Sequence, residues 1–387
     1  MILDDLPTPC LLVERSRLES NLETMQARAD EQGVRLRPHI KTHKTVALAR
    51  MQEGLGARGI TAAKVGEAER FVSDGFDDVC IAYPVVGDDK LRRIAELLSS
   101  ARISFCVDTR ESAKAASNFF AGRESVVDVL LEVDVGHHRC GVDPSDDRSV
   151  KLAREFAALP GVRLKGILTH AGHVYHGPRE GESKEEAMRR VSTEERDTML
   201  GFAERLHEAG VAEPGNFEIS VGSTPTARHF ENSELGGFRV TEMRPGNYVF
   251  NDAMQVSLGS ADLEDCALTV LTTIVSRHRN RSGRERLFAD AGSKVVATDK
   301  GPLTDGYGQM LYNARRMQPL PHARIAGLSE EHSWIEVSGG STLAVGNRVR
   351  FVPNHACVCT NLLDVVYVVD GEEVIDTWPV DARGRVY

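Results

Sequence analysis

Short apolar runs alternate with amphipathic stretches from residue 35 to about residue 250. Apolar runs bounded by turn residues predict strands, and the spacing of Leu91, Ile94 and Leu97 predicts a helix between two of them. Eight strands are predicted: Arg35–Lys41, Arg58–Ala62, Asp78–Ala82, Ile103–Val107, Val126–Asp134, Arg163–His170, Phe217–Val221 and Phe238–Met243. This alternation favours an α/β fold of the (β/α)8 TIM-like barrel type, with a doubly wound open sheet as the alternative.

The pattern differs on both sides of this region. Pro9–Glu14 predicts one more strand, and Arg15–Ala29 predicts a helix with an apolar face. Beyond residue 250, β-rich runs alternate with turn signals, which predicts a mainly antiparallel β domain. Its expected strands are Leu268–Val275, Trp334–Val337, Arg348–Val352 and Val365–Val369. We therefore expect a barrel over residues 15–250, and a β-rich domain formed by residues 1–14 and 251–387.

Composition narrows the function classes. A net charge of −10, from 47 basic and 57 acidic residues, argues against a nucleic-acid partner. The densest basic stretch, Arg277–Arg286, is predicted to be a solvated hairpin turn. No apolar run approaches the roughly 20 residues of a membrane span, and no signal peptide is recognisable, so no membrane association is expected. Seven scattered cysteines do not form a disulfide framework, which favours the reducing cytoplasm.

Lys41 ends the first predicted barrel strand, and barrels of this type carry their active sites at that end. Its sequence neighbours Arg37, His39, His43 and Lys44 are cationic or can become so. Nearby positive charge and burial lower the pKa of a lysine in general, which makes the amine a better nucleophile and Schiff-base former. The alternative interpretation is a basic loop that binds a phosphate, or a solvated turn.

His355 and Cys357 form a candidate metal site. On an extended segment, side chains two positions apart face the same way, and imidazole with thiolate suits zinc. Two protein ligands leave coordination positions open for water or substrate, as a catalytic site needs. Cys359 is a further possible ligand, but we expect a buried cysteine at this position.

Two loops have the composition of a phosphate cradle. Val221–Thr226 follows the seventh predicted strand and Arg244–Tyr248 follows the eighth, and both combine small residues with hydrogen-bond donors. Barrels commonly hold a phosphate in the loops after these two strands. A reactive lysine together with a phosphate cradle suggests pyridoxal phosphate (PLP) as the cofactor.

Two further loops carry candidate acid–base and anion-binding groups. Leu168–His176 contains three histidines and a tyrosine, which are plausible proton donors and acceptors or else idle surface histidines. Gly136–Gly141 follows the fifth predicted strand and contains Arg139. Arg139 is expected to face a phenolate oxygen or a substrate carboxylate, with a structural ion pair as the alternative.

These motifs resemble the fold-type III PLP enzymes related to alanine racemase, and within them the D-threonine aldolase / D-serine dehydratase family. The resemblance implies an alanine racemase-like barrel with Lys41 as the Schiff-base residue. Pro353–Cys357 resembles the zinc site of D-serine and D-3-hydroxyaspartate dehydratases, whereas aldolases usually carry Asp in place of Cys357. His176, however, falls where aldolases place a catalytic histidine. The matching segments are Thr8–Val13, Arg37–Lys44, Ile60–Glu69, Gly136–Gly141, Leu168–Tyr175, Gly222–Pro225, Arg244–Tyr248 and Pro353–Cys357.

The resemblance also implies roles for the remaining candidates. Ser223, Thr224, Gly246 and Asn247 would hold the phosphate of PLP. Tyr175 and Arg139 would line its ring, and Arg244 would reach the pyridine nitrogen.

The implied activity is that of a PLP- and metal-dependent lyase acting on a D-3-hydroxy amino acid such as D-serine, D-threonine or D-3-hydroxyaspartate. Dehydration to an oxo acid and ammonia is slightly favoured, and retro-aldol cleavage to glycine and an aldehyde is the alternative. An amino-acid racemase and a non-catalytic PLP carrier are the other hypotheses for its function. Zinc is the expected metal, with manganese or cobalt as alternatives, and relatives of this fold imply a homodimer.

Overall fold

The computed structural model describes residues 1–279, 281, 284–301, 303–311, 313–315, 317–320 and 322–387, which form two compact units. The barrel unit comprises Met25–Lys41, Leu48–Gly246 and Gly384–Tyr387. The β-rich unit comprises Met1–Thr24, Thr42–Ala47 and Asn247–Arg383.

Eight parallel strands form the sheet of the barrel unit in the described part of the chain. An isolated parallel bridge between His39 and Thr61 joins its first and last strands, so the sheet closes on itself. The predicted (β/α)8 TIM-like barrel is therefore confirmed. In spatial order the strands are β2 (Arg35–Leu36), β11 (Glu242–Met243), β8 (Glu218–Val221), β7 (Val162–Thr169), β6 (Val127–Val133), β5 (Arg102–Val107), β4 (Asp78–Pro84) and β3 (Ile60–Ala62).

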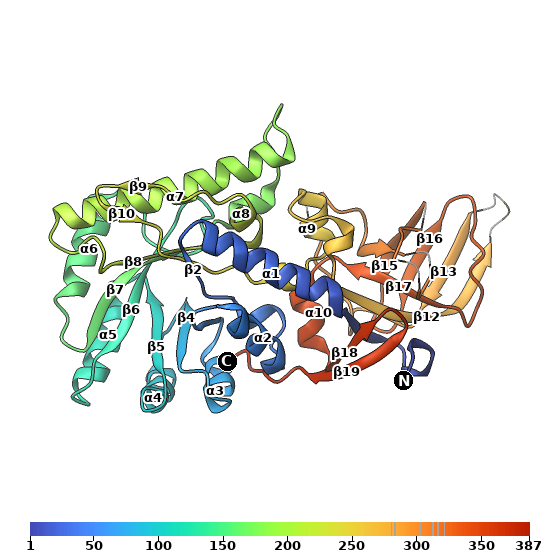
Figure 1. Cartoon of the computed structure of the whole chain (residues 1–387), viewed down its shortest axis with the longest axis horizontal. Helices are drawn as coiled ribbons and strands as arrows, with labels where there is room; N and C mark the ends of the chain where they lie inside the picture. Colours follow the sequence, from blue (N-terminus) through green and yellow to red (C-terminus); the bar gives the residue numbers. More distant parts are fainter. Residues whose placement is uncertain (280, 282–283, 302, 312, 316, 321) are drawn as a thin grey trace. The chain divides into compact units, whose positions relative to one another are not determined.

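Helices cover the outside of these strands, as Figure 1 shows for α3 to α7. Their amphipathic faces supply the apolar layer between helices and sheet, with Phe71 on α3, Leu91 on α4 and Phe120 on α5 fully buried. The helices are α2 (Val46–Leu55), α3 (Val65–Ser73), α4 (Asp88–Leu97), α5 (Arg110–Ala121), α6 (Asp147–Ala157), α7 (Lys184–Glu208) and α8 (Thr224–Arg228). Short 3-10 turns η2 (Ile40–Thr42) and η3 (Gly172–His176) follow strands β2 and β7.

Two predicted barrel strands differ from the observed ones. The strand predicted over Arg35–Lys41 ends at Leu36, because Pro38 has no N–H to donate and the chain then turns into η2. The strand predicted over Phe238–Met243 is split into β10 (Phe238–Arg239), which pairs with β9 (Glu234–Leu235), and the barrel strand β11. Between these two pieces the amide side chain of Asn232 bonds both the N–H and the C=O of Val240, which removes that residue from the ladder.

Alternate residues of the barrel strands point inward and form three levels. At the amino ends, Arg37 bonds Glu242 at 2.6 Å and Asp78 at 2.8 Å, which fills this level with compensated charge. The middle level is apolar and consists of Cys80, Cys106, Leu130 and Leu168. The level at the carboxyl ends is polar again and lines a cavity.

The β-rich unit contains a mainly antiparallel nine-stranded sheet within the described residues, as predicted. Strand β1 (Cys10–Glu14) belongs to this sheet, where it pairs antiparallel with β12 (Leu268–Arg279) and parallel with β18 (Val365–Asp370). The other strands are β13 (Glu285–Ala289), β14 (Gly308–Met310), β15 (Ala323–Leu328), β16 (Ser333–Val337), β17 (Arg348–Pro353) and β19 (Glu373–Pro379). Its helices and turns are η1 (Leu3–Asp5), η4 (Asn247–Val249), α9 (Ala253–Leu258), η5 (Leu263–Asp265) and α10 (Ala356–Leu362), and α1 (Arg15–Glu31) begins in this unit.

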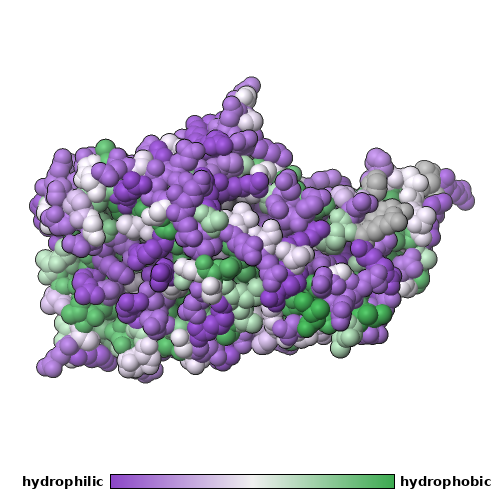
Figure 2. Space-filling view, in the orientation of Figure 1, coloured by the Kyte–Doolittle hydropathy of each residue, from purple (hydrophilic) through white to green (hydrophobic). Residues whose placement is uncertain are grey.

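The basic stretch predicted as a hairpin turn joins β12 to β13, which pair down to Arg279 opposite Glu285. Residues 280, 282 and 283 of that turn lie outside the described residues. The face of the molecule in Figure 2 is mostly hydrophilic, with hydrophobic residues in scattered groups. Within the described ranges, no helix combines the length and the apolar character needed to cross a membrane.

Candidate functional site

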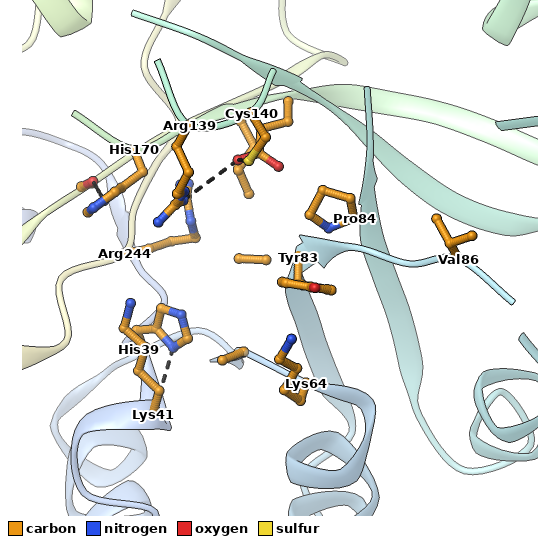
Figure 3. A pocket seen from close by; sticks show the side chains of 15 residues that line it. His39, Lys41, Lys64, Tyr83, Pro84, Val86, Arg139, Cys140, His170 and Arg244 are labelled. Carbon is orange, nitrogen blue, oxygen red and sulfur yellow. Dashed lines mark hydrogen bonds and ion pairs between the residues drawn. The ribbon is translucent and has the colours of Figure 1, made fainter. Parts of the chain in front are cut away.

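A cavity of about 530 Å³ opens at the carboxyl ends of the barrel strands. In Figure 3, Arg139 reaches into it from above, with Arg244 beneath, and His39 and Lys41 lie below them. Lys64 and Tyr83 form another part of the wall, with the Lys64 ammonium 3.3 Å from the centre of the Tyr83 ring. The lining residues are His39, Lys41, Ala63, Lys64, Ala82, Tyr83, Pro84, Val86, Glu132, Arg139, Cys140, Leu168, His170, Gly222 and Arg244.

Backbone pairing beyond the end of β2 places Lys41 in this cavity. The Pro38 carbonyl accepts the Thr61 N–H at 2.8 Å, and the His39 N–H donates to the Pro245 carbonyl at 3.0 Å. The chain is thus held on both sides up to His39, and η2 then carries Lys41 over the carboxyl end of the barrel. The predicted position of Lys41 at this end agrees with the structure.

The cations near Lys41 in space are not its neighbours in the sequence. Arg37 is buried and ion-paired at the opposite end of the barrel interior, and Lys44 Nζ donates to Asn361 Oδ1 at 2.7 Å in the β-rich unit. The other cations that line the cavity are Lys64, Arg139 and Arg244. They follow different strands, and the resemblance had already assigned Arg139 and Arg244 to the site, whereas Lys64 was not singled out.

Two histidines in the cavity are held neutral. Burial, reinforced by the positive charge of Lys41, lowers the pKa of His39 and of His170 well below the usual 6.5. His170 Nδ1 lies 3.0 Å from the Gly222 carbonyl oxygen, which can only accept, so Nδ1 carries the proton. The lone pair of His170 is therefore on Nε2, which makes this atom a candidate hydrogen-bond acceptor or base.

Arg244 is a buried cation of the cavity that hydrogen bonds hold in place. Its guanidinium donates to the Ser220 hydroxyl and, at 2.5 Å, to the Thr169 carbonyl, and the residue is 6% exposed. Gly222 allows the chain to pass close by, because a Cβ there would lie only 2.9 Å from the Arg244 backbone nitrogen. The Gly222 N–H is in turn held by the buried carboxylate of Glu195 at 3.0 Å.

The predicted phosphate-binding loops lie at this end of the barrel, but only part of them lines the cavity. Gly222 and Arg244 do, whereas Ser223, Thr224, Gly246 and Asn247 are not among the lining residues. Ser223 caps α8, and Asn247 belongs to the β-rich unit, where its amide donates to Asp252 at 2.5 Å.

Tyr175 and His176 lie in η3, after β7. Tyr175 is half-buried and packs against a cluster that contains Ala171 and Val174, whereas His176 is exposed. Neither lines the cavity in this form of the protein. Sequence reasoning did not single out Lys64, Tyr83 and Glu132, although inward alternation along β6 would have marked Glu132.

The lining residues fit a phosphate-bearing aldehyde cofactor such as PLP. Among the described residues that line the cavity, four are cations and one is a carboxylate, which favours an anionic occupant. One of the cations is the primary amine of Lys41, the group that can hold an aldehyde covalently. The volume of about 530 Å³ lies in the usual range of small-molecule sites.

The candidate metal pair lies in the β-rich unit, and one part of its prediction was wrong. His355 and Cys357 are not on an extended segment, because α10 begins at Ala356 and His355 is its N-cap. The two side chains nevertheless hydrogen-bond each other. His355 Nδ1 also lies 2.7 Å from Asp299 Oδ2, and the Thr42 hydroxyl lies 3.1 Å from Cys357 Sγ.

The donor chemistry of this pair fits a divalent metal. Burial lowers the pKa of His355, but the charges of Cys357 and Asp252 and the bond to Asp299 outweigh it and raise that pKa to about 10. The surroundings therefore attract a cation, and the Asp299 contact leaves His355 Nε2 for it. Cys359 is buried and accepts the Ala297 N–H at 3.3 Å, as expected for a structural cysteine. No cluster of three or more His, Cys, Asp or Glu suited to a metal occurs among the described residues.

Comparison with protein families identifies the relatives of this chain. Residues 13–253 match the family described as "Alanine racemase, N-terminal domain", and residues 267–369 match the "Putative serine dehydratase domain". The chain belongs to the fold-type III PLP enzymes related to alanine racemase. The resemblance found in the sequence is thereby confirmed.

Individual members of the family are similar over nearly the whole chain. The D-threo-3-hydroxyaspartate dehydratase of Delftia sp. (strain HT23) is 32% identical over 96% of this chain and 97% of that protein. The D-threonine aldolase of Arthrobacter sp. is 34% identical over 97% of this chain and 93% of that protein.

The Delftia dehydratase is also similar in structure, with a TM-score of 0.86 and 98% of each chain covered. Solved structures of D-threo-3-hydroxyaspartate dehydratase include two alanine variants that are each 32% identical to this chain. One, in the metal-free form, replaces a cysteine (TM-score 0.87, covering 98% of both chains). The other replaces a histidine two positions earlier (TM-score 0.86, covering 98% of this chain and 96% of that one).

Proposed function

We propose that the protein is a PLP- and divalent-metal-dependent lyase that acts on D-3-hydroxy amino acids, with dehydration as the favoured outcome. The observation that carries the proposal is the contact between His355 and Cys357. Their two-residue spacing equals that of the histidine and cysteine replaced in D-threo-3-hydroxyaspartate dehydratase, whose cysteine variant is described as metal-free. Zinc is the proposed metal, because imidazole and thiolate suit it, with manganese or cobalt as alternatives.

Lys41 is proposed to hold PLP covalently through Nζ. Bound PLP supplies an electron sink for charge that develops at the α-carbon of an amino acid. Arg139 would line the cofactor ring, and Arg244, fixed by Ser220 and Thr169, would present its guanidinium to the pyridine nitrogen. Tyr175 is the further residue that the resemblance assigns to the ring, although it does not line the cavity in this form of the protein.

The phosphate of the cofactor is assigned to the loops after β8 and β11. Their proposed phosphate-binding residues are Ser223, Thr224, Gly246 and Asn247. Small side chains and backbone N–H groups allow such loops to approach an anion closely.

In the dehydratase reaction, Lys41 Nζ would take the α-proton, and the β-hydroxyl would leave as water after receiving one proton, so that the elements of water are lost overall. His355 and Cys357 would hold the metal, which would supply Lewis-acid activation of that hydroxyl. The resulting enamine hydrolyses to an oxo acid and ammonia. Asp299 orients His355 by accepting the Nδ1 proton at 2.7 Å.

Retro-aldol cleavage to glycine and an aldehyde is the second candidate, favoured by the similarity to the D-threonine aldolase of Arthrobacter. It needs a base for the β-hydroxyl proton, and His176 is the proposed residue. His170 is a second candidate for this role, because it lines the cavity as a neutral imidazole with its lone pair on Nε2.

An amino-acid racemase or a non-catalytic PLP carrier would use the same barrel and lysine without a metal. Metal content and metal-dependent turnover separate these alternatives from the lyase. We further propose a homodimer in the cytoplasm, the assembly and compartment that the resemblance and the cysteine usage favour. Sedimentation of the loaded protein tests the assembly.

The deciding experiment incubates the purified protein, loaded with PLP and zinc, with D-threonine. Formation of 2-oxobutanoate and ammonia supports dehydration, whereas glycine and acetaldehyde identify an aldolase. D-Serine and D-3-hydroxyaspartate are assayed in parallel for an oxo acid and for glycine. Inactivity towards all three substrates would contradict the lyase assignment and favour the racemase or carrier.

A further inference from the structure

The reaction proposed above gives no role to Glu132, the one carboxylate among the described residues that line the cavity. Glu132 lies on β6 two positions beyond Leu130, so it faces the barrel interior directly above the apolar level. Its side chain is only 5% exposed. A carboxylate so deeply buried needs compensation from a cation or from hydrogen-bond donors.

The compensation that Glu132 receives is incomplete. Its Oε1 accepts from Cys140 Sγ at 3.0 Å and lies 3.8 Å from Arg139 Nη2, whereas the buried Oε2 has no hydrogen-bond partner. Burial accordingly raises the pKa of Glu132. The carboxylate can therefore accept a closer bond from Arg139 than the one seen in this form.

Arg139 is a half-exposed cation of the cavity wall, and its side chain contacts Cys140 and Glu132. Its loop closes on β6 through the Asp134 N–H to Val142 carbonyl bond (3.0 Å) and the Val142 N–H to Glu132 carbonyl bond (2.9 Å). This closure places the Arg139 backbone at the cavity mouth, but the side chain itself is 52% exposed. A long side chain at that exposure samples several rotamers unless a partner fixes it.

We propose that Glu132 is the positioning residue for Arg139, and that its carboxylate aims the guanidinium at an anionic group bound in the cavity. The ligand group is an oxyanion, either the phenolate of the cofactor or the carboxylate of the substrate. Charged donors and acceptors of this kind form strong, directional bonds, and a pre-aimed guanidinium loses less entropy when it binds. The assignment of the oxyanion rests on the proposed function, but the coupling between Glu132 and Arg139 is measurable without turnover.

The test is a double-mutant cycle of Glu132→Gln and Arg139→Gln. Two quantities are measured: the Kd of pyridoxal phosphate, by absorbance titration of cofactor-stripped protein, and KM and kcat for the substrate that is turned over. We expect Glu132→Gln alone to raise one of the two binding constants about five- to tenfold, with kcat within about twofold. In the Arg139→Gln background the same change should have less than about a twofold effect, because Glu132 acts through Arg139.

The binding constant that responds identifies the oxyanion. A shift in the Kd of pyridoxal phosphate identifies the cofactor phenolate, and a shift in KM alone identifies the substrate carboxylate. Glu132→Asp keeps the charge, so it should retain more binding than Glu132→Gln, which a purely structural role does not require.

Asp128→Asn is the matched control, because Asp128 lies on the same strand and pairs with Arg163 at 2.6 Å without lining the cavity. It should leave both binding constants unchanged. Equal effects of Glu132→Gln in both backgrounds, or no effect in either, overturn the proposal. If the wild type turns over none of the substrates, the proposed function fails, and an unchanged Kd for pyridoxal phosphate then overturns the role of Glu132 as well.

Discussion

Replacing Asp299 with alanine should weaken metal binding without unfolding the protein. Asp299 Oδ2 accepts the His355 Nδ1 proton at 2.7 Å, which fixes the ring and leaves Nε2 for the metal. The segment that carries Asp299 is held independently of this side chain, because Asn354 Nδ2 donates to the Asp299 carbonyl at 3.0 Å and to the Gly306 carbonyl at 2.9 Å. The variant should therefore lose the orientation of His355 and keep the backbone.

The magnitude follows from the role of the carboxylate. Loss of a residue that orients a metal-binding histidine typically costs 10–100-fold in metal affinity, or about 1.4–2.7 kcal/mol. Because the Asp299 side chain is 45% exposed, the free energy of unfolding of the metal-free protein should change by no more than about 0.5 kcal/mol. Turnover should return when zinc is raised to saturation, since His355 and Cys357 are both still present.

The assay is competition for zinc between the protein and a chelating dye. Asp305→Ala is the matched control, because the Asp305 side chain is 79% exposed and forms its ion pair with Arg324, at 2.8 Å, and not with His355. Its zinc Kd should equal that of the wild type. An unchanged Kd in Asp299→Ala, or equal losses in the two variants, would refute the reasoning.

Four further predictions follow from the same geometry. Lys41→Ala should lose the visible absorbance of bound PLP and all measurable turnover, and retained turnover would contradict its role. Chelation should abolish activity while the PLP absorbance remains, and full activity of metal-free protein would exclude the metal from the reaction. Gly222→Ala should cost about 1–3 kcal/mol in thermal unfolding, because its Cβ would lie 2.9 Å from the Arg244 backbone nitrogen, and it should weaken PLP binding. Burial raises the pKa of Glu242, but the positive charge of Arg37 outweighs burial and holds that pKa below 4.5. The Glu242–Arg37 pair should therefore stabilise the fold fully above pH 4.5, and this stabilisation should disappear as the pH falls through the lower folded pKa. Unfolding titrations of Glu242→Gln should lack this acid dependence.

The barrel could be predicted because its strands are buried on both faces and therefore stand out as apolar runs. The position of Lys41 was also predictable, because it follows the first barrel strand and the carboxyl ends of the strands together form one end of the barrel. The strand predicted over Phe238–Met243 failed because the side chain of Asn232, several residues away, takes both backbone groups of Val240. Such a competition between side chain and ladder leaves no periodic signal in the sequence.

The candidate metal pair shows a different limit. The spacing of His355 and Cys357 suggested shared orientation on a strand, yet the chain begins a helix at Ala356. The helix start is stabilised by Asp252, whose Oδ2 accepts the Ala356 N–H at 2.9 Å across more than a hundred residues of sequence. The two side chains still hydrogen-bond each other, although the predicted extended segment is wrong. Their role as metal ligands stays a prediction.

The charged residues inside the barrel explain why the binding cavity was harder to predict from the sequence than the fold. At the amino ends of the strands, Arg37 faces Glu242 and Asp78, so positive and negative groups offset one another in a closed level. At the carboxyl ends, four cations line the cavity with one carboxylate. The paired carboxylates at the amino ends, Asp78 and Glu242, begin strands β4 and β11, whereas the cations of the cavity lie in the segments that follow the strands. Strand periodicity therefore does not bring these cations together in the sequence. The two levels are distinguished by how their charges pair in three dimensions. A level with matched charges stabilises the fold, whereas an excess of cations costs stability until an anion binds. This excess of positive charge indicates an anion-binding site at the carboxyl end of the barrel.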